Sequence, residues 1–282
     1  MNAARLKPNG MSTTNKDIIR QIYDALADDY DHPANFFTHA FAKPMLNAID
    51  PAAGSRLLDA GAGTGVFALY AAKKMPEIHV TGIDLSALML DRARKKARER
   101  KLGNVEFKQM DMTALTFPDN YFDAITCCSS IYFLDDMAKG LKHMSSKIRP
   151  NGKIAANFFG KDAFLPLSLL FKRRYALFRP ESDLPEEPWE KLSDTAFVES
   201  LYHQAGIGNV SIWHEPLGFH LDAPETWWDI IWNTGYRYLL NQLSISERSV
   251  FKQRHMAEIA SLCEKKPRWI DASVTIVVGS AL

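Results

Sequence analysis

The stretch that decides the fold of this chain reads Leu57–Leu–Asp59–Ala–Gly61–Ala–Gly63–Thr–Gly65. Its apolar start predicts a short buried strand over residues 56–60, and its alternating glycines predict a tight turn before a helix over residues 66–74. Glycine has no side chain, so a ligand can approach the backbone of such a turn. The next helix presents unpaired N–H groups to that ligand. We therefore expect a ligand site at the carboxyl end of the first strand.

The same order of strand and helix continues along the chain. Apolar runs predict strands over residues 78–84, 105–111, 122–127, 153–159, 210–221 and 269–278, and helices over 86–101, 137–148 and 194–205. Strands that alternate with helices through right-handed crossovers form a doubly wound sheet. We therefore predict an α/β fold with a mostly parallel, seven-stranded sheet, similar to a Rossmann fold, and a helical cap.

The domain organisation is predicted from changes in pattern. Residues 1–15 are polar and are expected to form a disordered tail, and residues 16–50 are expected to form N-terminal helices with breaks at His32–Pro33 and near Pro44. The ligand-binding core follows over residues 51–160. Residues 161–282 should complete the sheet and supply the cap, which is expected at about 161–193 and 224–265.

Composition narrows the classes of partner. Hydrophobic residues make up 46% of the 282 residues, charged residues make up 24%, and the net charge is +1. This balance favours neither a nucleic acid nor an anionic membrane as partner. The three cysteines, Cys127, Cys128 and Cys263, do not resemble a disulfide framework and favour a reducing compartment. We expect a soluble, cytoplasmic protein.

The spacing around the glycines discriminates between nucleotide ligands. A dinucleotide site usually has Gly-x-Gly-x-x-Gly, whereas here Val66 takes the place of the third glycine, and Asp59 would repel a pyrophosphate. Asp84 ends the second predicted strand, where a carboxylate can bind both hydroxyls of a ribose. Asp111 ends the third, and Met112 beside it can lie against a purine. The three acids at strand ends favour a nucleoside ligand that carries positive charge.

At this point the chain resembles a known family. Residues 58–65, 82–86, 115–123 and 148–152 are similar to the motifs of class I S-adenosylmethionine-dependent methyltransferases. More narrowly, they resemble the ubiquinone/menaquinone-biosynthesis type, whose N-terminal helix motif is similar to residues 23–31. The resemblance implies S-adenosylmethionine as cofactor and a cap over the acceptor site. It also assigns cofactor contacts by position to Tyr23, Tyr30, Asp59, Gly61, Gly63, Thr64, Gly65, Asp84, Leu85, Asp111, Met112 and Cys128.

The catalytic residues are less defined, because a sulfonium is already activated and methyl transfer depends mainly on alignment and exclusion of water. His39 and Tyr132 are the candidates that could reach the acceptor, although a satisfied buried residue is an alternative interpretation for each. No histidine spacing indicates a metal site. The helix stripe of Trp228, Ile231, Trp232 and Leu239 either packs onto the sheet or lines an acceptor pocket.

We therefore predict a methyltransferase that acts on a small, hydrophobic or aromatic metabolite by in-line displacement. The alternatives are a nicotinamide-dependent oxidoreductase and a non-catalytic binding module on the same fold.

Overall fold

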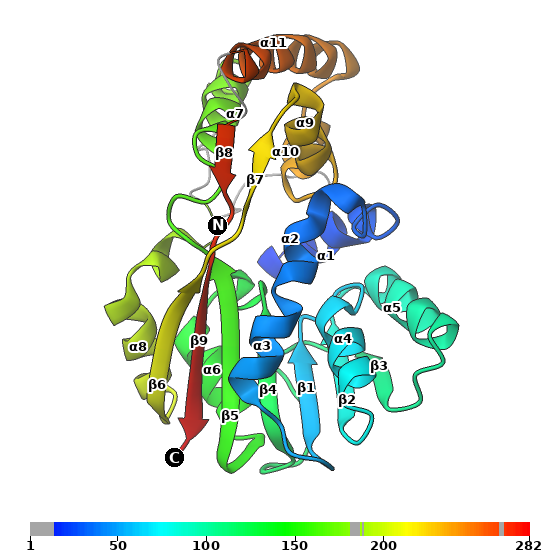
Figure 1. Ribbon diagram of the computed structural model, residues 1–282, viewed down its shortest axis with the longest axis vertical. Coiled ribbons are helices and arrows are strands. Elements are labelled where there is room, and N and C mark those ends of the chain that lie inside the picture. The colour runs from blue at the N-terminus through cyan, green and yellow to red at the C-terminus, as the bar shows by residue number, and fades with distance from the viewer. Residues whose placement is uncertain (1–13, 181–186, 188, 265–267) are drawn as a thin grey trace.

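A computed structural model of the chain describes residues 14–180, 187, 189–264 and 268–282. Its centre is a seven-stranded sheet in the order β3-β2-β1-β4-β5-β9-β6 (Figure 1). The first five strands are parallel, and β9 runs antiparallel between β5 and β6. The predicted fold class is confirmed. The strands are β1 (Arg56–Ala60), β2 (His79–Asp84), β3 (Val105–Gln109), β4 (Phe122–Cys128), β5 (Ile148–Phe159), β6 (Ile207–Glu215) and β9 (Val274–Ala281).

Two groups of helices cover the sheet. One group packs α3 (Ala42–Ile49), α4 (Val66–Lys74) and α5 (Ala87–Glu99) side by side, and the other packs α6 (Met137–Ser145) against α8 (Thr195–Gln204). From β1 the chain first adds strands toward β3 and then, on the other side of β1, toward β5. Because the crossovers are right-handed, this reversal of direction places the two groups of helices on opposite faces of the sheet. Ser86 caps α5, since its hydroxyl accepts a hydrogen bond from the Met89 N–H at 3.1 Å.

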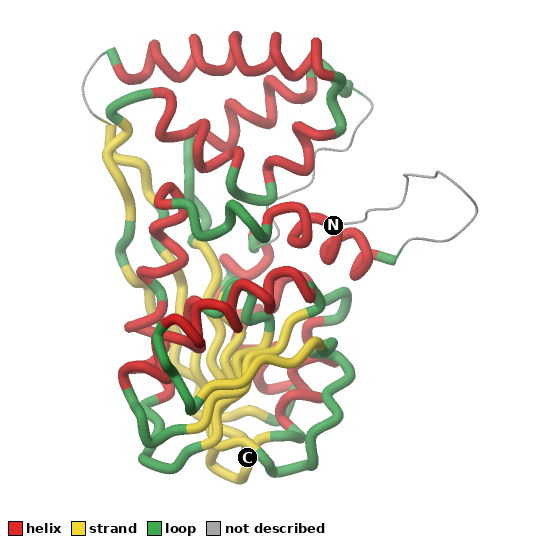
Figure 2. Tube along the Cα trace, turned by 90° about the vertical axis from the view of Figure 1, so that its right-hand side faces the viewer, coloured by secondary structure: helices red, strands yellow, loops and turns green. Residues whose placement is uncertain are grey.

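The cap stands beyond the carboxyl ends of the parallel strands. Strand β7 (Gly218–Leu221) continues the direction of β6, pairs with β8 (Arg268–Asp271), and the two form a ribbon that leads away from the main sheet (Figure 1). The ribbon carries α9 (Pro224–Trp232), α10 (Tyr236–Asn241) and α11 (Ile245–Cys263), and α7 (Leu167–Ala176) packs against α11. The long α11 forms the outer edge of this layer (Figure 2).

Several predicted boundaries were wrong for identifiable reasons. The strands predicted at 210–221 and 269–278 each divide into a part in the main sheet and a part in the ribbon. The expected cap segment 224–265 contains three helices. The other expected cap segment, 161–193, contains α7, whose buried residues Leu167, Phe171 and Tyr175 are helically spaced. The break predicted near Pro44 is confirmed: the helix Phe36–Ala40 ends just before α3 begins at Ala42, and Pro44 lies in the first turn of α3, where its missing N–H costs no bond.

The N-terminal segment lies between the sheet and the cap. Helix α1 (Asn15–Leu26) begins at a capping box in which Thr14 and Asp17 satisfy each other's backbone groups. The predicted break at His32–Pro33 is confirmed: a short 3-10 turn (Pro33–Asn35) leads into α2 (Phe36–Ala40). Most of the tail expected over residues 1–15 lies outside the described residues. In the described part of the chain, no helix has the length and apolarity needed to cross a bilayer.

Candidate active site

A cavity of about 90 Å³ lies at the carboxyl ends of β1–β4. Helix α1 forms one wall, and the loops that follow the four strands form the others. The lining residues are Lys16, Ile19, Arg20, Tyr23, Tyr30, Gly61, Gly63, Asp84, Leu85, Met89, Met110, Asp111, Met112, Cys128, Ser129, Ser130, Phe133 and Leu134. Nine of the twelve residues expected to contact the cofactor are therefore brought together here.

The glycine turn is shaped by its lack of side chains. Gly61, Gly63 and Gly65 all have positive φ, at 81°, 53° and 81°. A Cβ on Gly61 would lie 2.5 Å from the Cβ of Ser130, and one on Gly65 would lie 2.9 Å from that of Ala93. A Cβ on Gly63 would meet nothing within 4 Å, and Gly63 lines the cavity. Two of the glycines thus permit close packing, whereas Gly63 keeps space open.

Asp84 is fixed by the backbone of both neighbouring loops. Its Oδ2 accepts a hydrogen bond from the Gly63 N–H at 2.8 Å, and its Oδ1 accepts one from the Ser86 N–H at 2.9 Å. Burial raises the pKa of Asp84, and the two N–H groups oppose that shift. The carboxylate is therefore held in one orientation at the cavity wall, and it also ties the glycine turn to the end of β2.

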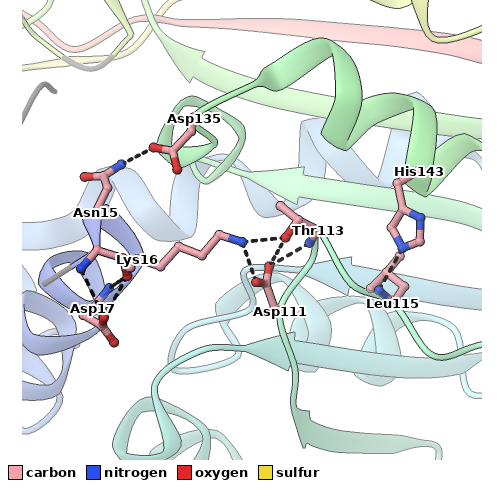
Figure 3. Close-up of polar contacts among 9 residues, drawn as sticks. Asn15, Lys16, Asp17, Asp111, Thr113, Leu115, Asp135 and His143 are labelled. Carbon is pink, nitrogen blue, oxygen red and sulfur yellow. Dashed lines mark hydrogen bonds and ion pairs between the residues drawn. The ribbon is translucent and has the colours of Figure 1, made fainter. Parts of the chain in front are cut away.

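Asp111 is reached from across the cavity by helix α1. The Lys16 Nζ lies 2.6 Å from the Asp111 Oδ2 and 2.6 Å from the Thr113 hydroxyl (Figure 3). Burial pushes the pKa of Asp111 upward, but the Lys16 ammonium and the hydrogen bonds from Thr113 outweigh it and lower that pKa. Asn15 also donates to Asp135 at 2.8 Å, which gives the start of α1 a second contact with the core (Figure 3).

Three of the expected residues support the glycine turn from behind and do not line the cavity. Asp59 is 1% exposed; its Oδ1 accepts from the Thr126 hydroxyl at 3.2 Å, and its Oδ2 has no hydrogen-bond partner among the described residues. Thr64 is buried, and its hydroxyl donates to Asp31 at 2.7 Å. Gly65 is the N-cap residue of α4.

Asp59 should make stability fall as the pH rises. Burial raises its pKa from the ordinary 3.8 to about 7, so between these values the folded protein keeps a proton that the unfolded chain has lost. The associated stability is complete below about pH 4 and is lost by about pH 7. Asparagine cannot ionise, so the unfolding free energy of Asp59→Asn should not show this loss. We expect the difference in unfolding free energy between Asp59→Asn and the unmodified protein to increase in favour of the variant by roughly 2–3 kcal/mol from pH 5 to pH 8.

Urea unfolding of both proteins at the two pH values measures this change, with Asp162→Asn as an exposed control. A difference in unfolding free energy that is the same at pH 5 and pH 8 would mean that Asp59 is ionised throughout.

An acidic segment, residues 24–31, clamps the N-terminal helix to the core and the cap. Asp24 accepts from the Ser86 hydroxyl at 2.5 Å, Asp28 pairs with Arg92, and Asp31 pairs with Lys96 at 2.7 Å. Arg237 of the cap, 9% exposed, donates to Asp29 at 2.7 Å. Part of the basic face of α5 therefore binds this segment. The charge pattern of α5 alone would have indicated a face exposed to solvent.

The two catalytic candidates occupy different places. His39 is exposed and does not line the cavity; partial burial lowers its pKa, and its charged neighbours are Asp31, Lys96 and Arg100. Tyr132 lies next to Phe133, which does line the cavity, with the ring centroids 4.7 Å apart. Tyr23 and Tyr30 meet edge to face at 5.9 Å, and burial raises the pKa of Tyr30 to about 12.

Several residues of the wall formed by α1 and the end of β4 were not among the expected contacts. Lys16, Ile19 and Arg20 lie on one helix face with the expected Tyr23, at intervals of three and four residues, and this period could have identified them. The pair Ser129–Ser130 directly follows Cys128 at the strand end, where parallel sheets bind ligands. Their position directly after a predicted strand could have identified these serines as site residues.

Aromatic side chains connect this site to the cap. Phe159, at the end of β5, contacts Phe37 at 5.4 Å and Trp189 at 4.9 Å, and Phe164 contacts Phe37 at 5.5 Å and Trp227 at 6.1 Å. We call these five residues the aromatic cluster. The cluster joins the N-terminal segment, the segment after β5 and the cap. The tryptophan-rich helix α9 packs against α10, α11 and the ribbon strand β7.

Comparisons with known proteins agree with this geometry. Residues 57–152 match the family described as "Methyltransferase domain". The chain is 35% identical over 151 residues, 52% of its own length, to the ubiquinone/menaquinone biosynthesis C-methyltransferase UbiE of Bdellovibrio bacteriovorus, and 27% identical over 155 residues, 53% of its length, to the demethylmenaquinone methyltransferase of Bacteroides fragilis. It spans less than two thirds of these relatives, 64% and 63%.

Among solved structures, the YcgJ protein of Bacillus subtilis shares the fold with a TM-score of 0.56. It is 20% identical, and the match covers 86% of this chain and 98% of that one. The sheet order, the cavity at the glycine turn and the matched motifs coincide in the same part of the molecule. Residues 57–152 are therefore a methyltransferase domain of the class I, S-adenosylmethionine-dependent type.

Proposed function

We propose that the whole chain transfers a methyl group from S-adenosylmethionine to a small, apolar or aromatic acceptor. The observation that carries the proposal is the position of Asp84, whose two oxygens are held by the Gly63 and Ser86 N–H groups at the cavity wall. A carboxylate fixed in this way suits two adjacent ribose hydroxyls.

Other residues around the cavity are suited to contact the remaining parts of the cofactor. The open space at Gly63 leaves room for the amino-acid part. Leu85 and Met112 supply apolar surface for a purine, and Asp111 can accept a hydrogen bond from its amino group once Lys16 moves or shares the carboxylate. Tyr23, Tyr30 and Cys128 complete the wall on the side of the N-terminal helix and β4.

When bound, S-adenosylmethionine supplies an activated methyl group; its carbon bonds to the acceptor, the electron pair of the broken bond stays on sulfur, and the acceptor loses a proton. The contribution of the chain is alignment and exclusion of water. The acidic segment holds α1 over the cavity, and the buried aromatic cluster packs the N-terminal segment against the segment after β5 and the cap. Tyr132 borders both regions, whereas His39 has no such position, and we do not include it in the proposed mechanism.

The class of the acceptor is proposed from the aromatic character of this region. Phenyl and indole rings stack on aromatic ligands, so an opening beside the buried cluster would favour a hydrophobic or aromatic acceptor. The names of the quinone-biosynthetic relatives are consistent with this class of acceptor. The cap residues lie outside the family match, and Tyr132 lies within it but does not line the cofactor cavity. These residues would then set the choice of substrate.

Calorimetry and a transfer assay test the proposal. S-adenosylmethionine and S-adenosylhomocysteine should bind the folded protein, and NAD and NADP should not. Transfer of a labelled methyl group into a metabolite extract separates an enzyme from a non-catalytic binding module. Binding of NAD in place of S-adenosylhomocysteine would favour the oxidoreductase alternative, and failure of a folded sample to bind either class would refute the proposed function.

A further inference from the structure

The cavity at the strand ends is small for a ligand of the proposed size. Its volume is about 90 Å³, whereas pockets that hold drug-sized molecules measure roughly 300–1,000 Å³. A wall of the cavity must therefore move outward before a nucleoside and its amino-acid part can both enter. The walls are of two kinds, with the loops after β1–β4 on one side and helix α1 on the other.

The loops after the strands are tied to the rest of the core. The Gly61 N–H donates to the Ile83 carbonyl at 2.9 Å, which joins the glycine turn to β2. The segment after β3, which carries Asp111, is held by α6, because the Leu115 N–H donates to the His143 Nε2 at 2.8 Å (Figure 3). Displacing these loops would break backbone hydrogen bonds, so we expect them to stay in place.

Helix α1 is anchored firmly at its C-terminal end. There Leu26 packs with Ala27 and with Met89 of α5 in a small apolar cluster, and the acidic segment 24–31 adds ion pairs to α5. Leu26 is also the one buried residue of α1, a helix that the structure describes in full. The N-terminal half, residues 15–21, therefore buries no side chain, and segments of this kind open locally at low cost.

Polar side chains hold the N-terminal half of α1 against the core. The Lys16 Nζ donates to the Asp111 Oδ2 and to the Thr113 hydroxyl, each at 2.6 Å (Figure 3). Asn15 donates to Asp135 at 2.8 Å, but this contact is exposed. The ion pair is better protected, since 38% of the Lys16 side chain and 27% of the Asp111 side chain are exposed. The charge-assisted contacts of Lys16 therefore provide most of the attachment.

Asp111 is also the carboxylate that is proposed to accept a hydrogen bond from the purine amino group. Its Oδ1 already accepts the N–H and the hydroxyl of Thr113, at 2.7 and 2.8 Å, and Lys16 binds its Oδ2. The hydrogens of a ligand amino group and of an ammonium both carry positive charge, so they repel each other at one oxygen. Because Lys16 belongs to the wall that has to move, the movement that enlarges the cavity also removes Lys16 from Asp111.

We propose that Lys16 is an autoinhibitory latch. While its ammonium is bound to Asp111, the N-terminal half of α1 lies across the cavity and the nucleoside cannot enter. Release of Lys16 lets this half move outward about the acidic segment 24–31. Only the molecules with an open latch bind the cofactor, so the latch lowers the apparent affinity. This inference rests on the proposed function, because it takes the ligand to be S-adenosylmethionine.

Calorimetric titration of Lys16→Met with S-adenosylhomocysteine tests the latch. This ligand has no net charge, so the loss of a cation from the wall has little long-range effect on it. Methionine keeps an unbranched apolar side chain but cannot pair with Asp111, and we expect the variant to bind roughly three- to tenfold more tightly. Lys147→Met removes a comparable pair, with Asp119 at 2.5 Å and outside the cavity, and should bind like the unmodified protein.

Salt provides an independent readout of the same contact. The pair of Lys16 and Asp111 is partly exposed, so it weakens when the salt concentration is raised from about 0.05 M to about 0.5 M. The affinity of the unmodified protein for S-adenosylhomocysteine should therefore rise about two- to fourfold over this range. The affinity of Lys16→Met should stay constant.

Hydrogen exchange of the protein without ligand separates the latch from cofactor binding. A detached helical half of about seven residues is too short to be stable by itself. The amides of residues 18–21 should therefore exchange several-fold faster in Lys16→Met than in the unmodified protein, whereas those of residues 24–30 should not change.

Failure of either protein to bind S-adenosylhomocysteine would refute the proposed function, and the exchange rates would still report on the attachment of α1. Tighter binding by Lys16→Met together with faster exchange would confirm the latch. Equal or weaker binding by the folded variant would overturn it, because Lys16 would then be neutral toward the cofactor or hold it. Tighter binding with unchanged exchange would show that Lys16 does not fasten the helix, and would also overturn the latch.

Discussion

Replacing Asp84 with alanine should weaken S-adenosylhomocysteine binding by about ten- to a hundredfold. Hydrogen bonds to a charged group contribute roughly 1.5–3 kcal/mol, and the variant loses such contacts to the ribose. It also leaves the Gly63 and Ser86 N–H groups without the oxygens that they donate to, which loosens the glycine turn. Isothermal calorimetry measures the affinity, and circular dichroism at the same temperature verifies that the variant is folded.

Asp91→Ala is the matched control for this prediction. Asp91 lies on α5, only a few residues further along the chain, and its carboxylate is 65% exposed and outside the cavity. We expect its affinity to equal that of the unmodified protein within about twofold, as for most surface substitutions. A folded Asp84→Ala variant with unchanged affinity would show that the ribose does not bind at this carboxylate.

Replacing Gly63 with asparagine should reduce cofactor binding below detection. A side chain at this position enters the open space beside the turn, where nothing lies within 4 Å, and that space is where the ligand is expected. Asparagine is preferable to valine for this test, because the φ of 53° is left-handed and asparagine tolerates that region better than branched residues. The same calorimetric titration measures the loss.

Gly206→Asn controls for backbone strain. Gly206 has a φ of 75°, a Cβ there would also meet nothing within 4 Å, and the residue lies between α8 and β6, away from the cavity. Both variants should show a similar small decrease in thermal stability, but Gly206→Asn should bind S-adenosylhomocysteine normally. Equal binding by the two variants would mean that the glycine turn does not face the ligand.

Much of the architecture follows from local sequence. The β1, β2 and β4 runs are apolar because both faces of a parallel strand are buried, and the helices between them show their caps and their periods. The cavity acids Asp84 and Asp111 are predictable for the same reason, since the carboxyl ends of parallel strands meet at one edge. Asp59, the aspartate of the first strand, was expected to contact the cofactor, but it is buried beneath the turn and does not line the cavity.

Tertiary structure decided the rest, because the contacts join residues that are far apart in the chain. Lys16 meets Asp111 across 95 positions and Arg237 meets Asp29 across 208, and no local period encodes such pairs. The same holds for Asn157 of β5, whose side-chain amide donates a hydrogen bond to Ser129 after β4. Burial has a further effect that the residue type alone does not show: by removing water from Asp59, the fold raises the pKa of its carboxyl to about 7, so the group keeps a proton at pH values where an exposed aspartate is ionised.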